Sequence, residues 1–224
     1  SNYYGISTGL FAIGDAYEFW DQWFGRDHYS AAGLTDPKKA ERLKSQIAGI
    51  YRACQRPLIT KNNRNSLMIG DFHRLFPNAF FIVVERQDLS VIRSTVRASR
   101  DFFGMGNLWG LVPYESFDPG RFENLQEAAT VQYLELDRKI EDQLVDLPDE
   151  AYMRVNYEEF CSNPVQIQED IARKLGSKHG IAQDDVVYKD PGFSSSSRLD
   201  NSGLDEQILQ YLDKWRPRYS NQIN

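Results

Sequence analysis

The sequence predicts an α/β domain built on a parallel sheet with helices on both faces. The strongest strand candidate, residues 79–84 (AFFIVV), is a continuous apolar run, which is typical of a strand buried on both faces. A second buried-strand candidate covers residues 152–155. Amphipathic helical patterns separate the two runs, and strands separated by helices favour a parallel arrangement.

The first half of the chain alternates helices with short apolar runs. Asp36 and Pro37 suit an N-cap and a first helical position, so a helix is expected over 36–55. Pro57 ends that helix, and Pro77 ends the next one. The other elements expected here are an aromatic helix over 15–24, a short strand over 58–60 and a helix over 65–76.

The second half is mainly helical, apart from the strand candidate at 152–155. Residues rich in Gly, Pro and aromatic side chains predict a loop over 103–120, and polar residues predict another over 177–203. Gly176 is expected to end a helix. The helices expected here cover 88–100, 122–144, 164–175 and 204–215.

Composition predicts one domain over residues 1–224. With 41% hydrophobic and 26% charged residues, the chain is ordinary for a globular protein. A net charge of −6 argues against a nucleic-acid partner, and no apolar run approaches about 18 residues, so no membrane segment is expected.

Without a signal peptide the expected location is cytoplasmic. A Golgi-lumenal catalytic domain stays open, because the first residue is Ser rather than Met.

Neither the cysteines nor the histidines follow a metal-ligand spacing. Cys54 and Cys161 are far apart, and the three histidines are scattered. Two distant cysteines make no disulfide framework, and no Cys-x-x-Cys pair is present. No metal cofactor is therefore expected.

An anion site is predicted at the carboxyl end of the strongest strand. Arg86 follows that strand directly, and Ser94 lies eight residues later in the next helix. Ligands of parallel sheets bind where strands end and helices begin, and a helix N-terminus favours an anion. A guanidinium can hold two phosphate oxygens while a hydroxyl donates to a third. Taken alone, the spacing also fits an Arg paired with an acid and a Ser facing the core.

The wider segment from Leu58 to Val96 resembles the sulfotransferase superfamily, especially tyrosylprotein sulfotransferases and their bacterial relatives. The shared order is a strand ending in Lys, a helix ending in Leu-Phe-Pro, a buried strand, an Arg, and a Ser eight residues later. The resemblance implies that Arg86 and Ser94 bind the 3′-phosphate of 3′-phosphoadenosine 5′-phosphosulfate (PAPS). It implies that Lys61 stabilises the transferring sulfuryl group.

A second patch, residues 154–159 with Asn163-Pro164, resembles the family segment whose tyrosine lies against the nucleotide. Tyr157 is the matching residue. Sulfotransferases commonly close over the nucleotide with a Ser- or Arg-bearing loop near the C-terminus, which makes Arg198 a further candidate for the 3′-phosphate pocket. A flexible polar linker explains this loop equally well. The resemblance covers roughly residues 57–176.

The resemblance implies a P-loop-kinase-like fold and transfer of a sulfuryl group from PAPS to a hydroxyl or amine acceptor. PAPS, or its desulfated product 3′-phosphoadenosine 5′-phosphate (PAP), is the expected nucleotide. The sequence departs from the family pattern in two ways. Gln87-Asp88 follows Arg86, with Asp88 as the expected N-cap. The printed chain lacks the family's N-terminal strand and 5′-phosphosulfate loop. Residues 5–9 (GISTG) match the loop poorly, because no strand precedes them and they contain no Arg or Lys. The strand and the loop are therefore expected upstream of Ser1.

The general base and the acceptor are left open. Cytosolic sulfotransferases carry a His two residues after the lysine, and that position here is Asn63. The acids and the histidine near the start of the chain, namely Asp15, Glu18, Asp27 and His28, have no motif that singles one out. The aromatic residues of 102–117 are candidates to line an acceptor pocket. The acceptor stays open among a small molecule, a carbohydrate and a protein.

Two alternatives compete with an active sulfotransferase. A non-catalytic relative would bind the desulfated nucleotide and transfer nothing. A P-loop kinase-like phosphotransferase would share the architecture, but it should carry Gly-x-x-x-x-Gly-Lys-Ser/Thr, and that motif does not occur in the sequence.

Overall fold

A computed structural model of the 224-residue chain describes residues 15–26, 36–55, 58–103, 118–179 and 203–220, together with single residues at 108, 188, 190 and 192. The elements of these residues, in chain order, are α1 (Tyr17–Phe24), α2 (Pro37–Cys54), η2 (Asn63–Leu67), α3 (Ile69–Leu75), β1 (Phe81–Glu85), α4 (Asp88–Phe103), η3 (Pro119–Arg121), α5 (Leu125–Leu144), η4 (Asp149–Ala151), β2 (Tyr152–Asn156), α6 (Tyr157–Ser162), α7 (Pro164–His179) and α8 (Leu204–Ser220).

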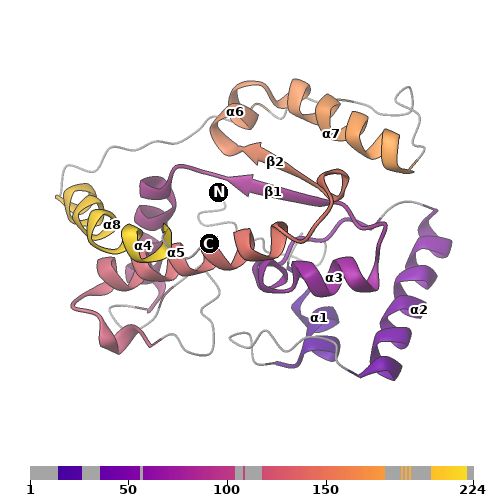
Figure 1. The fold of residues 1–224 in the computed structure, drawn as a ribbon, viewed down its shortest axis with the longest axis horizontal. Helices are drawn as coiled ribbons and strands as arrows, with labels where there is room; N and C mark the ends of the chain where they lie inside the picture. The colour runs from indigo at the N-terminus through magenta and orange to yellow at the C-terminus, as the bar shows by residue number, and fades with distance from the viewer. Residues whose placement is uncertain are drawn as a thin grey trace.

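The two strands of the described residues form one parallel sheet, which confirms the predicted fold class. Phe81 pairs with Tyr152 at one end, and Glu85 pairs with Asn156 at the other. The connection between the strands runs through α4 and α5. In Figure 1 the sheet lies between α6 and α7 on one side and α5 on the other, and α4 and α8 lie at the left, beyond the end of β1. Both strands therefore end at the edge where α4 and α6 begin.

The prediction that the first strand is buried on both faces is wrong: in the structure one of its faces is exposed. Phe81 and Val83 pack against the cluster formed by α3 and α5, but Ile82 is 45% exposed and Val84 is 62% exposed. The predicted strand at 58–60 is also wrong, because these residues have no strand pairing and Ile59 is 88% exposed. A strand needs a neighbour for its backbone groups, and only β1 and β2 pair within the described ranges.

Several helix boundaries differ from the sequence predictions. Asp36 caps α2 as expected, accepting a hydrogen bond from the Lys38 amide at 2.9 Å. Asp88 is not the N-cap of α4, since the amides of Ser90 and Val91 donate to the carbonyl of Gln87 instead. Helix α7 continues through Gly176 to His179, and α8 extends beyond Trp215 to Ser220. The short helix α6 was not expected.

Helix α1 is fixed to the segment before α3 by a buried arginine. Arg64 is 1% exposed and donates to the backbone carbonyls of Phe24 and Gly25, where α1 ends. A cation suits the negative end of a helix, and Asp21 adds a carboxylate at 3.7 Å. Trp20 also donates from its indole to the Thr60 hydroxyl at 3.2 Å. Apolar side chains around these contacts form a core cluster of Trp20, Trp23, Phe24, Leu43, Met68 and Phe72.

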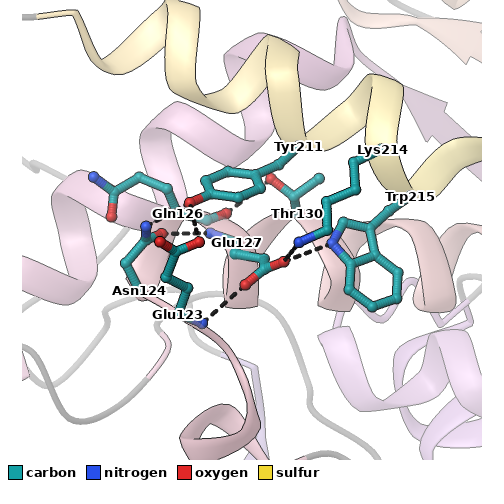
Figure 2. Close-up of polar contacts among 8 residues, drawn as sticks. All are labelled: Glu123, Asn124, Gln126, Glu127, Thr130, Tyr211, Lys214 and Trp215. Carbon is teal, nitrogen blue, oxygen red and sulfur yellow. Dashed lines mark hydrogen bonds and ion pairs between the residues drawn. The ribbon is translucent and has the colours of Figure 1, made fainter.

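Helices α4, α5 and α8 form a second core, with a buried carboxylate at its edge. The apolar part includes Ile92, Val96, Leu125, Ala129, Leu134, Leu204, Ile208 and Leu212. At its edge Glu127, only 3% exposed, accepts hydrogen bonds from the Lys214 ammonium (2.6 Å), the Trp215 indole (2.9 Å) and the Glu123 amide (2.8 Å). Figure 2 shows these donors converging on one side chain from α8 and from the start of α5.

Burial alone would raise the pKa of Glu127, but the hydrogen bonds from Lys214, the Glu123 amide and Trp215 outweigh it and lower the pKa. A carboxyl whose pKa is lowered by folding stabilises the folded state above its unfolded pKa of about 4.3, and this contribution is lost as pH falls. The contact therefore fixes α8 to α5 at neutral pH.

No helix among the described ranges has both the length and the apolar character that crossing a bilayer requires.

We expect Glu127→Gln to lower the free energy of unfolding by about 1–2 kcal/mol at pH 7, the scale for a hydrogen bond to a charged group. The deficit should shrink as pH approaches 4, because protonation removes the charge from the wild-type carboxyl as well. Urea denaturation at several pH values measures both effects. Glu123→Gln is the matched control at the same helix end, and an equal loss in this control would contradict the role of Glu127.

Candidate functional site

The structure brings Arg86 and Tyr157 together at the carboxyl edge of the sheet. Arg86 follows β1 directly, and Tyr157 is the first residue after β2. Because Glu85 pairs with Asn156, the next residue of each strand lies at the same height. The guanidinium carbon of Arg86 lies 4.6 Å from the centre of the Tyr157 ring, a stacked cation–π contact.

Glu158 forms an ion pair with the same guanidinium. Its carboxylate oxygen lies 3.6 Å from Nε of Arg86, too far for a hydrogen bond but within ion-pair range. Nε of Arg86 is buried without a hydrogen-bond partner, whereas the side chain as a whole is 26% exposed. Within the described part of the chain, no hydrogen bond occupies the terminal nitrogens of Arg86.

The tyrosine of this pair stays uncharged at neutral pH. A hydrogen bond with Cys161 and then burial raise the pKa of Tyr157, and the positive charge of Arg86 only partly opposes them. A neutral phenol ring presents its electron-rich face to the guanidinium without placing a negative charge beside a bound phosphate.

Ser94 lies within the first two turns of α4, on an exposed side of the helix. The N-terminus of this helix carries its own carboxylate: Asp88 accepts from the Tyr133 hydroxyl at 2.8 Å and from Arg216 of α8. These two contacts tie α4 to α5 and to α8. The roles predicted for Arg86 and Ser94 toward a phosphate stay predictions.

A second arginine of the sheet, Arg154, is paired with carboxylates. Arg154 of β2 pairs with Glu85 and with Glu141, the latter through contacts of 2.8 and 2.6 Å. Burial, followed by the charges of Glu141, Asp88 and Glu85, raises the pKa of Asp137. Arg154 is therefore fully engaged with carboxylates, in contrast to Arg86.

Lys61 belongs to a separate cluster at the start of α1. Its ammonium lies 2.9 Å from a carboxylate oxygen of Asp15, and the side chains are 74% and 19% exposed. Asn62 donates to the backbone carbonyl of Asp15 at 2.8 Å. Of the two candidate bases that the structure describes, Asp15 and Glu18, Asp15 is thus the one in contact with Lys61. The contact spans 46 residues, so no local pattern could have indicated it.

Other predicted site features lie outside the described residues. These are Arg198 with the serines at 194–197, the segment 5–9, Asp27, His28 and most of the aromatic loop at 102–117. Phe102 is described and is 46% exposed at the end of α4.

A shallow groove of about 580 Å³ lies between α3 and the second half of α5, away from Arg86 and Tyr157. Leu147, which lines it, packs near Phe81 and Tyr152, the residues that begin the two strands. Its polar lining mixes Asp71, His73, Arg74, Lys139, Asp142 and Asp146. The groove therefore lies at the opposite end of the sheet from the predicted phosphate contacts. No group of three metal-ligating side chains gathers anywhere in the described ranges.

Comparisons with known proteins identify the family. A family model described as "Sulfotransferase family" matches residues 15–179, which is most of the chain. The solved "Sulfotransferase Domain from the Curacin Biosynthetic Pathway" is similar, with 19% sequence identity and a TM-score of 0.45. The match covers 79% of this chain and 64% of that one, so this chain spans less than two thirds of the solved domain. No curated protein matches the sequence significantly.

The family model runs from Asp15, the partner of Lys61, to the end of α7, and it includes both strands and the Arg86–Tyr157 pair. The chain therefore belongs to the sulfotransferase family.

Proposed function

We propose that the protein transfers a sulfuryl group from PAPS to a hydroxyl or amine acceptor. The observation that carries the proposal is the Arg86–Tyr157 pair at the ends of two parallel strands, where the guanidinium is stacked and no described residue hydrogen-bonds to its terminal nitrogens. Family membership supports sulfuryl transfer. The donor and the acceptor are inferences from the chemistry of the residues.

In this proposal Arg86 and Ser94 bind the 3′-phosphate of the nucleotide. The guanidinium donates two parallel hydrogen bonds to phosphate oxygens, and the Ser94 hydroxyl donates a third. The ring of Tyr157 keeps the guanidinium in one plane, which reduces the conformational freedom lost on binding. Arg198 is proposed as a further cation for the same phosphate.

Lys61 acts on the other end of the donor. During transfer the acceptor oxygen forms a bond to sulfur, while the bond from sulfur to the 5′-phosphate oxygen breaks. The electron pair of that bond remains on the phosphate, and the acceptor proton leaves to a base. The ammonium of Lys61 would stabilise the charge on the sulfuryl oxygens and on the departing phosphate, as cations do in phosphoryl transfer.

We expect Arg86→Ala to weaken PAP binding by about 1.5–3 kcal/mol, or about 10- to 150-fold in Kd, because it removes hydrogen bonds from a charged donor. Isothermal titration calorimetry measures the change. Arg173→Ala is the matched control, since Arg173 pairs with Asp170 on the exposed face of α7. Unchanged affinity in folded Arg86→Ala protein would contradict the proposed pocket.

Two substitutions at Tyr157 separate the contribution of its ring to PAP affinity from that of its hydroxyl. Tyr157→Phe keeps the ring over Arg86, so PAP affinity should change by less than about twofold. Tyr157→Leu removes the cation–π contact, and we expect a loss of about 0.5–2 kcal/mol, or about 2- to 30-fold. Equal losses in the two variants would show that the ring does not support the guanidinium.

A transfer assay with ³⁵S-labelled PAPS and a panel of phenols, sugars and peptides tests the activity itself. We expect label in at least one acceptor, and we expect Lys61→Met to reduce the rate by about 100-fold or more, the scale for loss of one charge-stabilising group. PAP binding without transfer to any acceptor would favour the non-catalytic alternative. Binding of ATP with Mg²⁺ in preference to PAP would favour a kinase-like phosphotransferase.

A further inference from the structure

We propose that Asp15 is a positioning residue for Lys61, which holds the ammonium where it meets the sulfuryl group of the donor. The inference rests on the proposed function of Lys61. Its basis is the 2.9 Å ion pair between a carboxylate that is only 19% exposed and an ammonium that is 74% exposed. One partner is fixed in the protein, and the other extends into solvent.

An exposed lysine does not hold its ammonium in one place unaided. Its four-carbon stem populates many rotamers, and fixing them costs conformational entropy. Ion pairs between two mobile surface side chains contribute little. The Asp15–Lys61 pair differs because the backbone and the side chain of Asp15 are both held by neighbours.

Two contacts hold Asp15, and the residue after it has a strained backbone. Its backbone carbonyl accepts from Asn62, which is 5% exposed. Its carboxylate accepts a hydrogen bond from the Tyr17 hydroxyl, and burial together with this carboxylate raises the pKa of Tyr17. Ala16, the next residue, has φ 50° and ψ 43°, a left-handed conformation that is unfavourable for a side chain with a Cβ. Such strained residues persist only where surrounding contacts hold them.

The segment that carries Lys61 is fixed to the same helix. Thr60 accepts from Trp20 of α1, and Arg64 closes the far end of α1 through the carbonyls of Phe24 and Gly25. Asn62 joins the two sides, because its side chain donates to the Asp15 carbonyl and accepts from the Arg64 amide at 2.9 Å. Residues on both sides of Lys61 are therefore anchored, and only its side chain needs a further restraint.

The pair leaves the ammonium able to bind a ligand. A lysine ammonium has three N–H donors, and one of them points to Asp15. No other described residue contacts the ammonium, and in this proposal the other two donors bind oxygens of the sulfuryl group on the solvent side. Asp15 therefore orients the ammonium of Lys61 but uses only one of its N–H donors. In this proposal Asp15 acts only through the lysine.

The test uses nucleotide binding, so it needs no knowledge of the acceptor. The ratio of the Kd for PAP to the Kd for PAPS reports contacts made to the sulfuryl group. We expect Lys61→Met to lower this ratio most. Asp15→Asn should lower it by about 2- to 10-fold, the scale for losing the preorganisation of one rotamer-rich side chain, while PAP affinity itself stays unchanged. Asp15→Glu should retain most of the wild-type ratio, because it keeps the carboxylate.

The double variant decides between direct and indirect action. If Asp15 acts through Lys61, adding Asp15→Asn to Lys61→Met changes the ratio no further. A further loss in the double variant, or an unchanged or increased ratio in Asp15→Asn alone, would overturn the proposal. Glu41→Gln, which breaks an exposed ion pair of the same length with Lys44 in α2, is the matched control, and circular dichroism verifies folding. A protein that does not bind PAP at all would instead refute the proposed function, and the positioning role with it.

Discussion

The parallel pairing of β1 with β2 is the constraint on which the rest of the candidate site depends. Parallel strands end at the same edge of a sheet, and the register from Phe81–Tyr152 to Glu85–Asn156 sets which residues meet there. Arg86 and Tyr157 each follow the last paired residue of a strand. A register shifted by one residue would turn these side chains to the other face, and the stacked pair would be lost.

The helices around the sheet keep this edge in place through charged contacts as well as apolar packing. Asp88 joins the start of α4 to α5 and α8, and Glu127 fixes α8 to the start of α5. Arg154 joins β2 to α5. Arg86 differs from Arg154, because a ring and a carboxylate at 3.6 Å support it and no described residue hydrogen-bonds to its terminal nitrogens. That contrast is the physical basis for assigning it to a ligand.

The sequence was sufficient to predict the elements that have a strong periodic or apolar signal. The strands at 79–84 and 152–155 and the helix begun by Asp36-Pro37 are present with small shifts in their ends. The predicted strand at 58–60 was wrong because so short a segment, Leu-Ile-Thr, cannot reveal whether a neighbouring strand is there to pair with it. The helix at 157–162 is too short for its spacing to stand out.

The candidate site was predictable in part. Arg86 could be named from the apolar run before it, and Tyr157 from its resemblance to a family segment, but the stacking of the two could not be predicted. The partner of Lys61 lies 46 residues away and the partner of Glu127 lies 87 away. An acid on a polar surface looks the same in sequence whether or not it meets a lysine, so such contacts become visible only when the chain is folded.

The most direct test of the central claim is a crystal structure of the protein with PAP bound. We predict that the 3′-phosphate lies within hydrogen-bond distance of the terminal nitrogens of Arg86 and of the Ser94 hydroxyl, with Tyr157 beside the nucleotide. A nucleotide bound elsewhere, or a 3′-phosphate that contacts neither residue, would contradict the account.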